Sequence, residues 1–258
     1  MTRQPYAGRC VAFLTQHGKE RVVAPVLEAA AGCRVERVAG YDTDQLGTFT
    51  RDIPRFGTQL DAARRKARIG MSLAKSPLGL ASEGSFGPDP FAGMFSWNVE
   101  VLIFIDDELG IEVCGVFQGP GGGGHLLAAD WTAVEAFARK AGFPAQQLVL
   151  RPDGENDPRI RKGIASWPAL RAAFAWTRRL SGSGKVFVEF DLRAHAHPGR
   201  MENIRSAAED LAVKLHSCCP ACGAPGYALV ERVAGLPCAD CGANPADGGE
   251  CRRVRHHP

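Results

Sequence analysis

Apolar and polar residues follow patterns that predict alternating strands and helices in the first third of the chain. Cys10–Leu14 is an almost continuous apolar run, as in a buried strand, and Arg34–Val38 alternates as a half-buried strand does. Between Thr58 and Leu73, apolar residues recur at three- and four-residue steps, which predicts a helix with one apolar face. That face carries Leu60, Ala63, Ala67, Met71 and Ala74. Pro77 and Gly79 then end the helix.

Further elements follow in the rest of the chain. Val99–Ile105 is the most strongly β-forming run, and with Ile111–Phe117 it predicts a hairpin that turns at Asp106–Gly110. The remaining predicted elements are a helix capped by Asp130 and ended by Gly142, a strand at Leu148–Leu150, a helix at Trp167–Leu180, a strand at Lys185–Asp191 and a helix from about Met201.

Composition narrows the class of protein. The 258 residues are 45% hydrophobic and 23% charged, as in soluble globular proteins. A net charge of +3 is too small to indicate a nucleic-acid or membrane partner. No apolar run approaches the ~20 residues that span a bilayer, and the start, Met1–Tyr6, lacks the apolar stretch of a secretory signal. We therefore expect a cytoplasmic protein without a membrane partner.

The cysteines divide the chain into two parts. Six of the nine lie within the last 41 residues, which predicts a core domain over 1–215 and a small metal-binding domain over 216–258. Cys219 and Cys222 form one Cys-x-x-Cys turn, and Cys238 and Cys241 form a second, fifteen residues later. Four thiolates in this spacing are typical of a structural zinc ribbon. The segment 227–233 would supply its strand.

Cys251 has two interpretations in the same region. With His256 or His257 it could be the remnant of another metal site, or it could be a surface cysteine beside the C-terminal tail.

Two stretches before residue 90 carry candidate chemistry. The short apolar run Leu78–Ala81 predicts a buried strand that delivers Glu83 onto a turn rich in glycine and serine. Such a carboxylate is either a reactive group or a solvated side chain. After the first strand, Thr15–Glu20 places free backbone N–H groups and Lys19 at a helix start, which favours phosphate binding. The glycine spacing of a Walker loop is missing.

A third candidate lies at the junction before the last long helix. Four basic or titratable residues gather there beside two carboxylates: Arg193, His195, His197 and Arg200, with Glu189 and Asp191. The cluster is either an internal ion-pair network or part of a functional site. His125, beside the flexible loop Gly119–Gly124, is either an exposed loop residue or a group that moves onto a ligand.

Two family resemblances extend this interpretation. The full chain looks like an uncharacterised bacterial family, a domain of unknown function with a C-terminal four-cysteine ribbon. The matching stretches are His17–Glu20, Asp42–Phe49, Ala81–Pro88 and Cys219–Cys222. That family carries no known activity.

More remotely, the first 120 residues resemble the inosine-triphosphate-pyrophosphatase-like superfamily. Thr15, Gly18 and Lys19 match its first turn, Thr48–Phe49 and Asp61–Ala67 stand for its next signature, and Ser82–Gly84 for its acidic glycine turn. In that superfamily a Ser-His-Arg motif opens the last helix, and Pro198–Arg200 lies in the comparable position here. The departures are Ala62 for the usual Asn, a single Glu83 for paired Asp, and the missing Ser-His.

We therefore expect an α/β fold with an elongated, mixed, pyrophosphatase-like sheet flanked by helices, followed by the zinc ribbon. The resemblance implies Mg²⁺-dependent pyrophosphohydrolysis of standard or modified nucleoside triphosphates. Glu83 and Asp61 would hold the metal or orient water. Phosphate or nucleotide contacts would come from Thr15, His17, Gly18, Lys19, Lys66, Arg193 and Arg200. The alternative is a non-enzymatic module that binds nucleic acid or a protein through the ribbon and the Arg/His junction.

Overall fold

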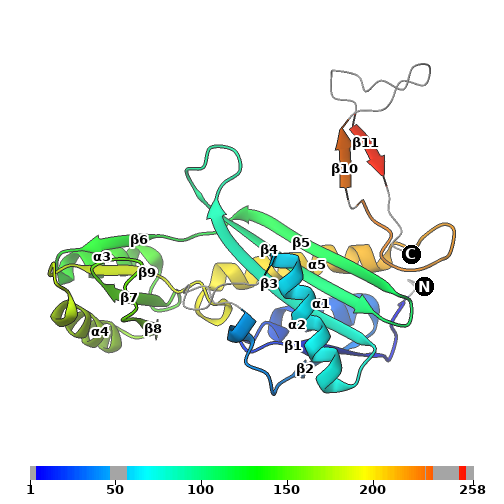
Figure 1. Ribbon diagram of the computed structural model, residues 1–258, viewed down its shortest axis with the longest axis horizontal. Coiled ribbons are helices and arrows are strands. Elements are labelled where there is room, and N and C mark those ends of the chain that lie inside the picture. The colour runs from blue at the N-terminus through cyan, green and yellow to red at the C-terminus, as the bar shows by residue number, and fades with distance from the viewer. Residues whose placement is uncertain (1–3, 47–56, 230, 235–249, 254–258) are drawn as a thin grey trace.

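A mixed five-stranded sheet forms the larger lobe of the molecule (Figure 1). The computed structural model describes residues 4–46, 57–229, 231–234 and 250–253. The elements of this lobe are β1 (Cys10–Leu14), α1 (Glu20–Ala31), β2 (Arg34–Val38), a 3-10 turn (Thr43–Leu46), α2 (Gln59–Ala74), β3 (Leu78–Pro88), β4 (Ser96–Asp106), β5 (Ile111–Pro120) and α5 (Pro198–His216).

The strand order is β2-β1-β3-β4-β5, with β1 parallel to both neighbours and the β3–β4–β5 strands antiparallel. One face packs against α1 and α5, because Leu80, Leu102 and Phe104 share a core with Leu27 and Ile204. The opposite face is covered by α2, whose buried residues Ala63, Ala67 and Met71 contact Ala81, Ile103 and Ile105. This arrangement confirms the α/β fold with a mixed sheet between helices.

A second lobe has its own antiparallel sheet, in the order β6-β9-β7-β8, and its own core. Its elements are β6 (His125–Ala128), α3 (Trp131–Ala141), β7 (Leu148–Pro152), β8 (Arg161–Ile164), α4 (Trp167–Leu180) and β9 (Val186–Phe190). Two connections join the lobes, one from β5 to β6 and one from β9 to α5 (Figure 1).

Beyond α5 the chain forms a short two-stranded sheet, in which β10 (Glu231–Ala234) pairs with β11 (Glu250–Arg253). The strand expected over 227–233 therefore begins later, at Glu231. Across the described ranges, no helix combines the length and apolar character that a membrane crossing requires.

Several local predictions are confirmed. Asp130 caps α3 by accepting from the Ala133 N–H, and Gly142 ends the helix in the left-handed conformation. The hairpin of β4 and β5 also forms as predicted.

Two predictions are wrong. Glu83 does not lie on a turn, because β3 continues to Pro88 and pairs with β4 along its whole length. The last long helix, α5, begins at Pro198 rather than near Met201, with the His197 side chain capping its first turn.

Candidate functional site

The candidate site lies where β1 ends and β3 continues. Only Gly79 and Leu80 of β3 are paired with β1, so the next residues of β3 face the loop that leaves β1. Lys19, at the end of that loop, is buried, and its Nζ donates to the carbonyl oxygen of Ser82 at 3.1 Å and to its hydroxyl at 3.2 Å. These bonds hold the N-terminus of α1 against the middle of β3.

On the α2 side of the sheet, Lys66 and Glu83 form a buried ion pair. The Nζ of Lys66 lies 2.6 Å from Oε2 of Glu83, and the two side chains are 11% and 9% exposed. Gln59, at the start of α2, donates to the backbone carbonyls of Glu83 at 2.8 Å and Val99 at 2.9 Å. The helix is thereby fixed over the carboxylate by backbone contacts as well as by charge.

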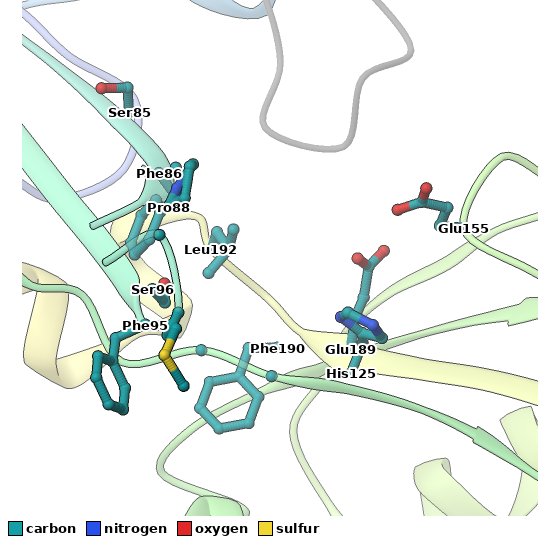
Figure 2. Close-up of a pocket in the computed structure, with 15 residues that line it drawn as sticks. Ser85, Phe86, Pro88, Phe95, Ser96, His125, Glu155, Glu189, Phe190 and Leu192 are labelled. Atoms are coloured by element: carbon teal, nitrogen blue, oxygen red, sulfur yellow. The ribbon is translucent and has the colours of Figure 1, made fainter. Parts of the chain in front are cut away.

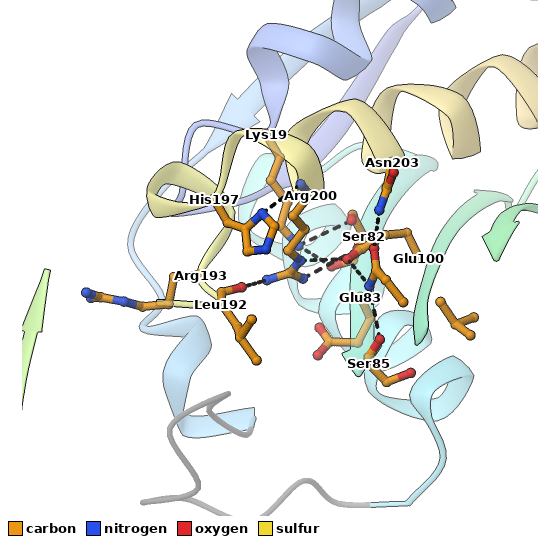
Figure 3. A network of polar contacts seen from close by, with 12 residues as sticks. Lys19, Ser82, Glu83, Ser85, Glu100, Leu192, Arg193, His197, Arg200 and Asn203 are labelled. Carbon is orange, nitrogen blue, oxygen red and sulfur yellow. Dashed lines mark hydrogen bonds and ion pairs between the residues drawn. The ribbon is translucent and has the colours of Figure 1, made fainter. Parts of the chain in front are cut away.

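On the opposite face, Arg200 of α5 and Glu100 of β4 form a second ion pair (Figure 3). Arg200 Nε lies 2.6 Å from Glu100 Oε1, both side chains are almost fully buried, and Arg200 also donates to the Leu192 carbonyl at 2.7 Å. Gly84 lies opposite Glu100 in the β3–β4 register. A Cβ at Gly84 would overlap the Glu100 carboxylate and the Arg200 guanidinium, so only glycine fits there.

The cluster of Lys19, Lys66, Glu83, Glu100 and Arg200 carries three cations and two carboxylates. Burial, followed by the charges of Arg200 and Lys66, lowers the pKa of Lys19 to about 7, although Glu100 and Glu83 act in the opposite sense. With Lys19 protonated, the cluster is short of negative charge, and an anionic ligand would stabilise that charged form.

His17 and His195 lie beside this cluster, with ring centroids 4.9 Å apart. Burial, then the charge of Lys19, lowers the pKa of His17 to about 3, so His17 is neutral at physiological pH. It can therefore offer a hydrogen bond but not a positive charge to a ligand.

His197 presents a buried polar atom toward the same region. Its Nδ1 accepts the Arg200 N–H at 3.0 Å, and burial, with the Arg200 charge next, lowers its pKa, so the neutral ring carries its proton on Nε2. Within the described part of the chain, no acceptor lies in reach of this buried Nε2. The ring lies between Phe86, at 5.9 Å, and Phe190, at 6.1 Å, between centroids.

A cavity of about 700 Å³ adjoins the cluster and is lined by both lobes (Figure 2). This volume is within the ~300–1,000 Å³ of small-molecule sites. The larger lobe contributes Phe86 and Phe95, and the smaller lobe contributes Phe190 and Glu189. Ser85 and Leu192 also line it, and their carbonyls accept from Asn98 and Arg200, so cavity and cluster share a wall.

The structure brings together Lys19, Lys66, Glu83 and Arg200, with His17 nearby. Gly18 adopts a left-handed conformation, with φ of 69°, in the turn before α1. Thr15 is buried in that loop. In this arrangement Arg200 holds Glu100 and the Leu192 carbonyl rather than projecting into the cavity.

Other expected site residues lie elsewhere. Asp61 is exposed and forms a capping box with Thr58 and an ion pair with Arg64, so it does not join Glu83. Arg193 pairs with the buried Asp191 at 2.6 Å, as the ion-pair interpretation of that junction required. Thr48–Phe49 and the cysteines 238 and 241 lie outside the described residues.

Glu100 is the site residue that the sequence did not reveal. It lies within the apolar run of β4, where its fully buried carboxylate is matched by an arginine 100 residues later. A charged residue inside a strongly apolar strand was the available signal, because such a group is buried only with a partner.

Comparison with known proteins places part of the chain in a family. The model of a family described as domain of unknown function (DUF6671) matches residues 66–249, which confirms the resemblance to such a family. The matched region contains Lys66, Glu83, Glu100 and Arg200, and it also contains the four clustered cysteines of the two Cys-x-x-Cys turns. No curated protein and no solved structure gives a significant match.

Proposed function

We propose that this chain, which belongs to the family described as domain of unknown function (DUF6671), is a nucleotide pyrophosphohydrolase. It would cleave a nucleoside triphosphate into a monophosphate and pyrophosphate. One observation carries the proposal: a buried cluster, which has excess positive charge when Lys19 is protonated, shares a wall with a cavity of nucleotide size. The first part suits phosphates and the second suits a base and sugar.

Lys19 and Lys66 are the proposed phosphate-binding residues. Among the described residues, Lys19 Nζ donates two hydrogen bonds, both to Ser82. An ammonium has three N–H donors, so the third can donate to a phosphate oxygen. Lys66 is held by Glu83 and would share its remaining donors in the same way. The element order, together with the meeting of Lys19, Lys66 and Glu83, supports an inosine-triphosphate-pyrophosphatase-like fold.

Magnesium fits the site only together with the substrate. Among the residues that the structure describes, no group of three or more His, Cys, Asp or Glu side chains is placed to hold a metal ion. Mg²⁺ is, however, commonly bound by one or two carboxylates plus substrate phosphates, and Glu83 is the carboxylate paired with Lys66. The ion would neutralise phosphate charge during cleavage.

The aromatic side chains of the cavity would hold the base. Phe86, Phe95 and Phe190 come from both lobes and line it (Figure 2). Aromatic rings stack on any base, so this wall supplies affinity rather than choice between bases. The ring of His197 packs against Phe86 and Phe190 and so helps to fix both aromatic side chains.

The test is pyrophosphate release by the purified full chain with Mg²⁺, over a panel of standard and modified nucleoside triphosphates. At least one member should be hydrolysed. Lys66→Met should abolish most of this activity, whereas Lys140→Met, on the exposed face of α3, should leave it unchanged. If folded protein hydrolyses no member of the panel, the enzymatic proposal is wrong.

A non-enzymatic protein-binding module is the second candidate, and the tip of the β3–β4 hairpin favours it. Phe91, Met94 and Phe95 are 87%, 78% and 68% exposed there. Asp89 accepts four backbone N–H bonds within this loop, so the apolar side chains are held on a rigid turn. Nucleotide binding without turnover, together with capture of a protein through this tip, would support this candidate.

For the C-terminal segment we propose a structural zinc ribbon with ligands Cys219, Cys222, Cys238 and Cys241. The thiol of Cys219 accepts the Ala221 N–H at 3.3 Å. Burial opposes ionisation, yet backbone N–H groups of Cys222 and Ala221 outweigh it and lower the pKa of Cys219. A sulfur that accepts a backbone N–H within a Cys-x-x-Cys turn supports metal binding at Cys219.

A further inference from the structure

The wall of the cavity formed by the smaller lobe differs chemically from the aromatic wall. Glu189 of β9, Glu155 of the loop after β7, and His125 of β6 line it (Figure 2). His125 and Glu189 are direct cross-strand partners in the antiparallel β6–β9 pair, so their side chains lie on the same face. Ser85 lies at the other side of the cavity, two residues along β3 from Glu83, so that side is opposed by a wall that carries carboxylates (Figure 2).

Buried contacts position two of these groups. Arg151, whose side chain is only 5% exposed, donates through Nε to Glu189 Oε1 at 3.3 Å and through Nη1 to the Asp157 carbonyl at 2.7 Å. The ring of His125 stacks on Phe187, with centroids 5.3 Å apart and planes at 28°. Both side chains are thus held in place at the cavity rim. An ionised carboxylate has about four lone-pair sites, so Glu189 can accept from Arg151 and from a ligand at once.

This wall selects one kind of hydrogen-bonding edge. Ionised carboxylates only accept hydrogen bonds, whereas a neutral imidazole can donate one. The complementary base edge would offer an acceptor next to two N–H donors. Guanine presents this pattern with O6, N1–H and its 2-amino group. Hypoxanthine lacks the 2-amino donor, and uracil flanks its single N–H with carbonyl oxygens that a carboxylate repels.

We infer that the cavity selects guanine nucleotides, with His125 facing O6 and Glu189 accepting from N1–H and the 2-amino group. Glu155, from the neighbouring loop, lines the same side. This inference rests on the proposed nucleotide site, but it does not require that the nucleotide be hydrolysed. It identifies Glu189 and His125 as specificity-determining residues.

The test compares two ligands that differ only in the 2-amino group, the non-hydrolysable α,β-methylene analogues of GTP and ITP. Calorimetry on the full chain with Mg²⁺ should give a Kd for the guanine analogue about 10- to 100-fold lower, the effect of one hydrogen bond to a charged group. Glu189→Gln should reduce that ratio to nearly one, and it should weaken the inosine analogue less than the guanine analogue, because hypoxanthine loses only the N1–H bond to the carboxylate. The matched control, Glu202→Gln on the exposed part of α5, should keep the ratio.

The outcomes separate the two proposals. Equal affinity for both analogues, or an unchanged ratio in Glu189→Gln, overturns the guanine inference even if triphosphates are hydrolysed. A guanine preference that Glu189→Gln removes, without hydrolysis of any triphosphate, supports the inference and overturns the enzymatic proposal. If neither analogue binds to folded protein, both are wrong.

Discussion

Lys66 Nζ lies 2.6 Å from Glu83 Oε2 in a pair that is largely buried, although the residues come from a helix and from the strand beneath it. Glu83 is the carboxylate that we place at the phosphates. Glu83→Gln should therefore lower kcat on the order of 10²-fold or more, because charge at the metal and the reacting phosphates is lost. Steady-state pyrophosphate release measures this.

Glu108→Gln is the matched control for that measurement. Glu108 is a surface residue paired with Arg9, its side chain is 56% exposed, and it should tolerate the amide with unchanged kcat. Full activity in Glu83→Gln would remove Glu83 from the reaction.

The Lys66–Glu83 pair should also contribute to stability, in a way that depends on both partners. Lys66→Met removes the ammonium that lies 2.6 Å from the buried Glu83 carboxylate, which should cost ~3–5 kcal/mol of unfolding free energy, as breaking a buried ion pair does. Adding Glu83→Gln removes that charge and should restore part of the loss. Urea denaturation of the two single variants and the double variant tests this coupling. Strictly additive losses would mean that the pair is not coupled.

Gly84 and Gly87 allow a direct test of the buried Glu100–Arg200 pair. Both glycines lie in β3, but a Cβ at Gly84 would overlap both charged groups, whereas a Cβ at Gly87 meets nothing within 4 Å. Gly84→Ala should lower the unfolding free energy by ~1–3 kcal/mol, the usual cost of overpacking. Gly87→Ala should be close to neutral by urea denaturation, and equal effects of the two substitutions would contradict the packing argument.

Local signals predicted much of the fold. The cap at Asp130, the stop at Gly142 and the β4–β5 hairpin each depend on residues close in sequence, and all are present. The course of β3 was not predictable in the same way. Its second half, from Ser82, contains glycine, serine and proline and resembles a turn by composition. It is held as a strand by pairing with Ser96–Leu102 of β4, a contact outside any local window.

The candidate site could be predicted only in part, because some of its contacts also join residues that are distant in sequence. Lys19 was proposed from the turn before a helix, Glu83 from a turn that proved to be part of β3, and Lys66 from the family resemblance; the structure brings the three together. Asp61 was misplaced because its spacing in the helix fits a capping box as well as a ligand. Glu100 was missed because its partner, Arg200, is distant in sequence. The cavity between the lobes depends on how two separate sheets are placed, which no local pattern encodes.

Nucleotide affinity should depend on pH through Lys19. Burial and the neighbouring cations lower the pKa of Lys19 to about 7, so its ammonium is mostly charged below that pH and mostly neutral above it. Phosphate binding requires the charged form, so affinity should decrease by on the order of tenfold between pH 6.5 and 8.5. Titrating a non-hydrolysable triphosphate at several pH values measures this.

Two substitutions at Lys19 isolate its contribution from the titration of the ligand itself. Lys19→Arg stays charged throughout and should lose the part of the pH dependence that wild type owes to this residue. Lys19→Met should also lose that part of the pH dependence, and it should bind the triphosphate more weakly at every pH. A wild-type profile that coincides in shape with that of Lys19→Met would show that Lys19 does not bind the phosphates.

The C-terminal cysteines lead to the last prediction. Elemental analysis should find about one zinc per chain, because four thiolates in two Cys-x-x-Cys turns fill a tetrahedral site. So short a segment contains few large apolar residues, so the metal should supply most of its folding free energy, on the order of 10 kcal/mol in comparable peptides. Chelation or Cys238→Ser should therefore unfold the segment after Ser217, while the two larger lobes keep their separate cores. Hydrogen exchange across the chain shows this as lost protection at Ala228 and in β10, with Cys251→Ser as the control that keeps it. Protection that survives chelation would mean that these cysteines hold no structural zinc.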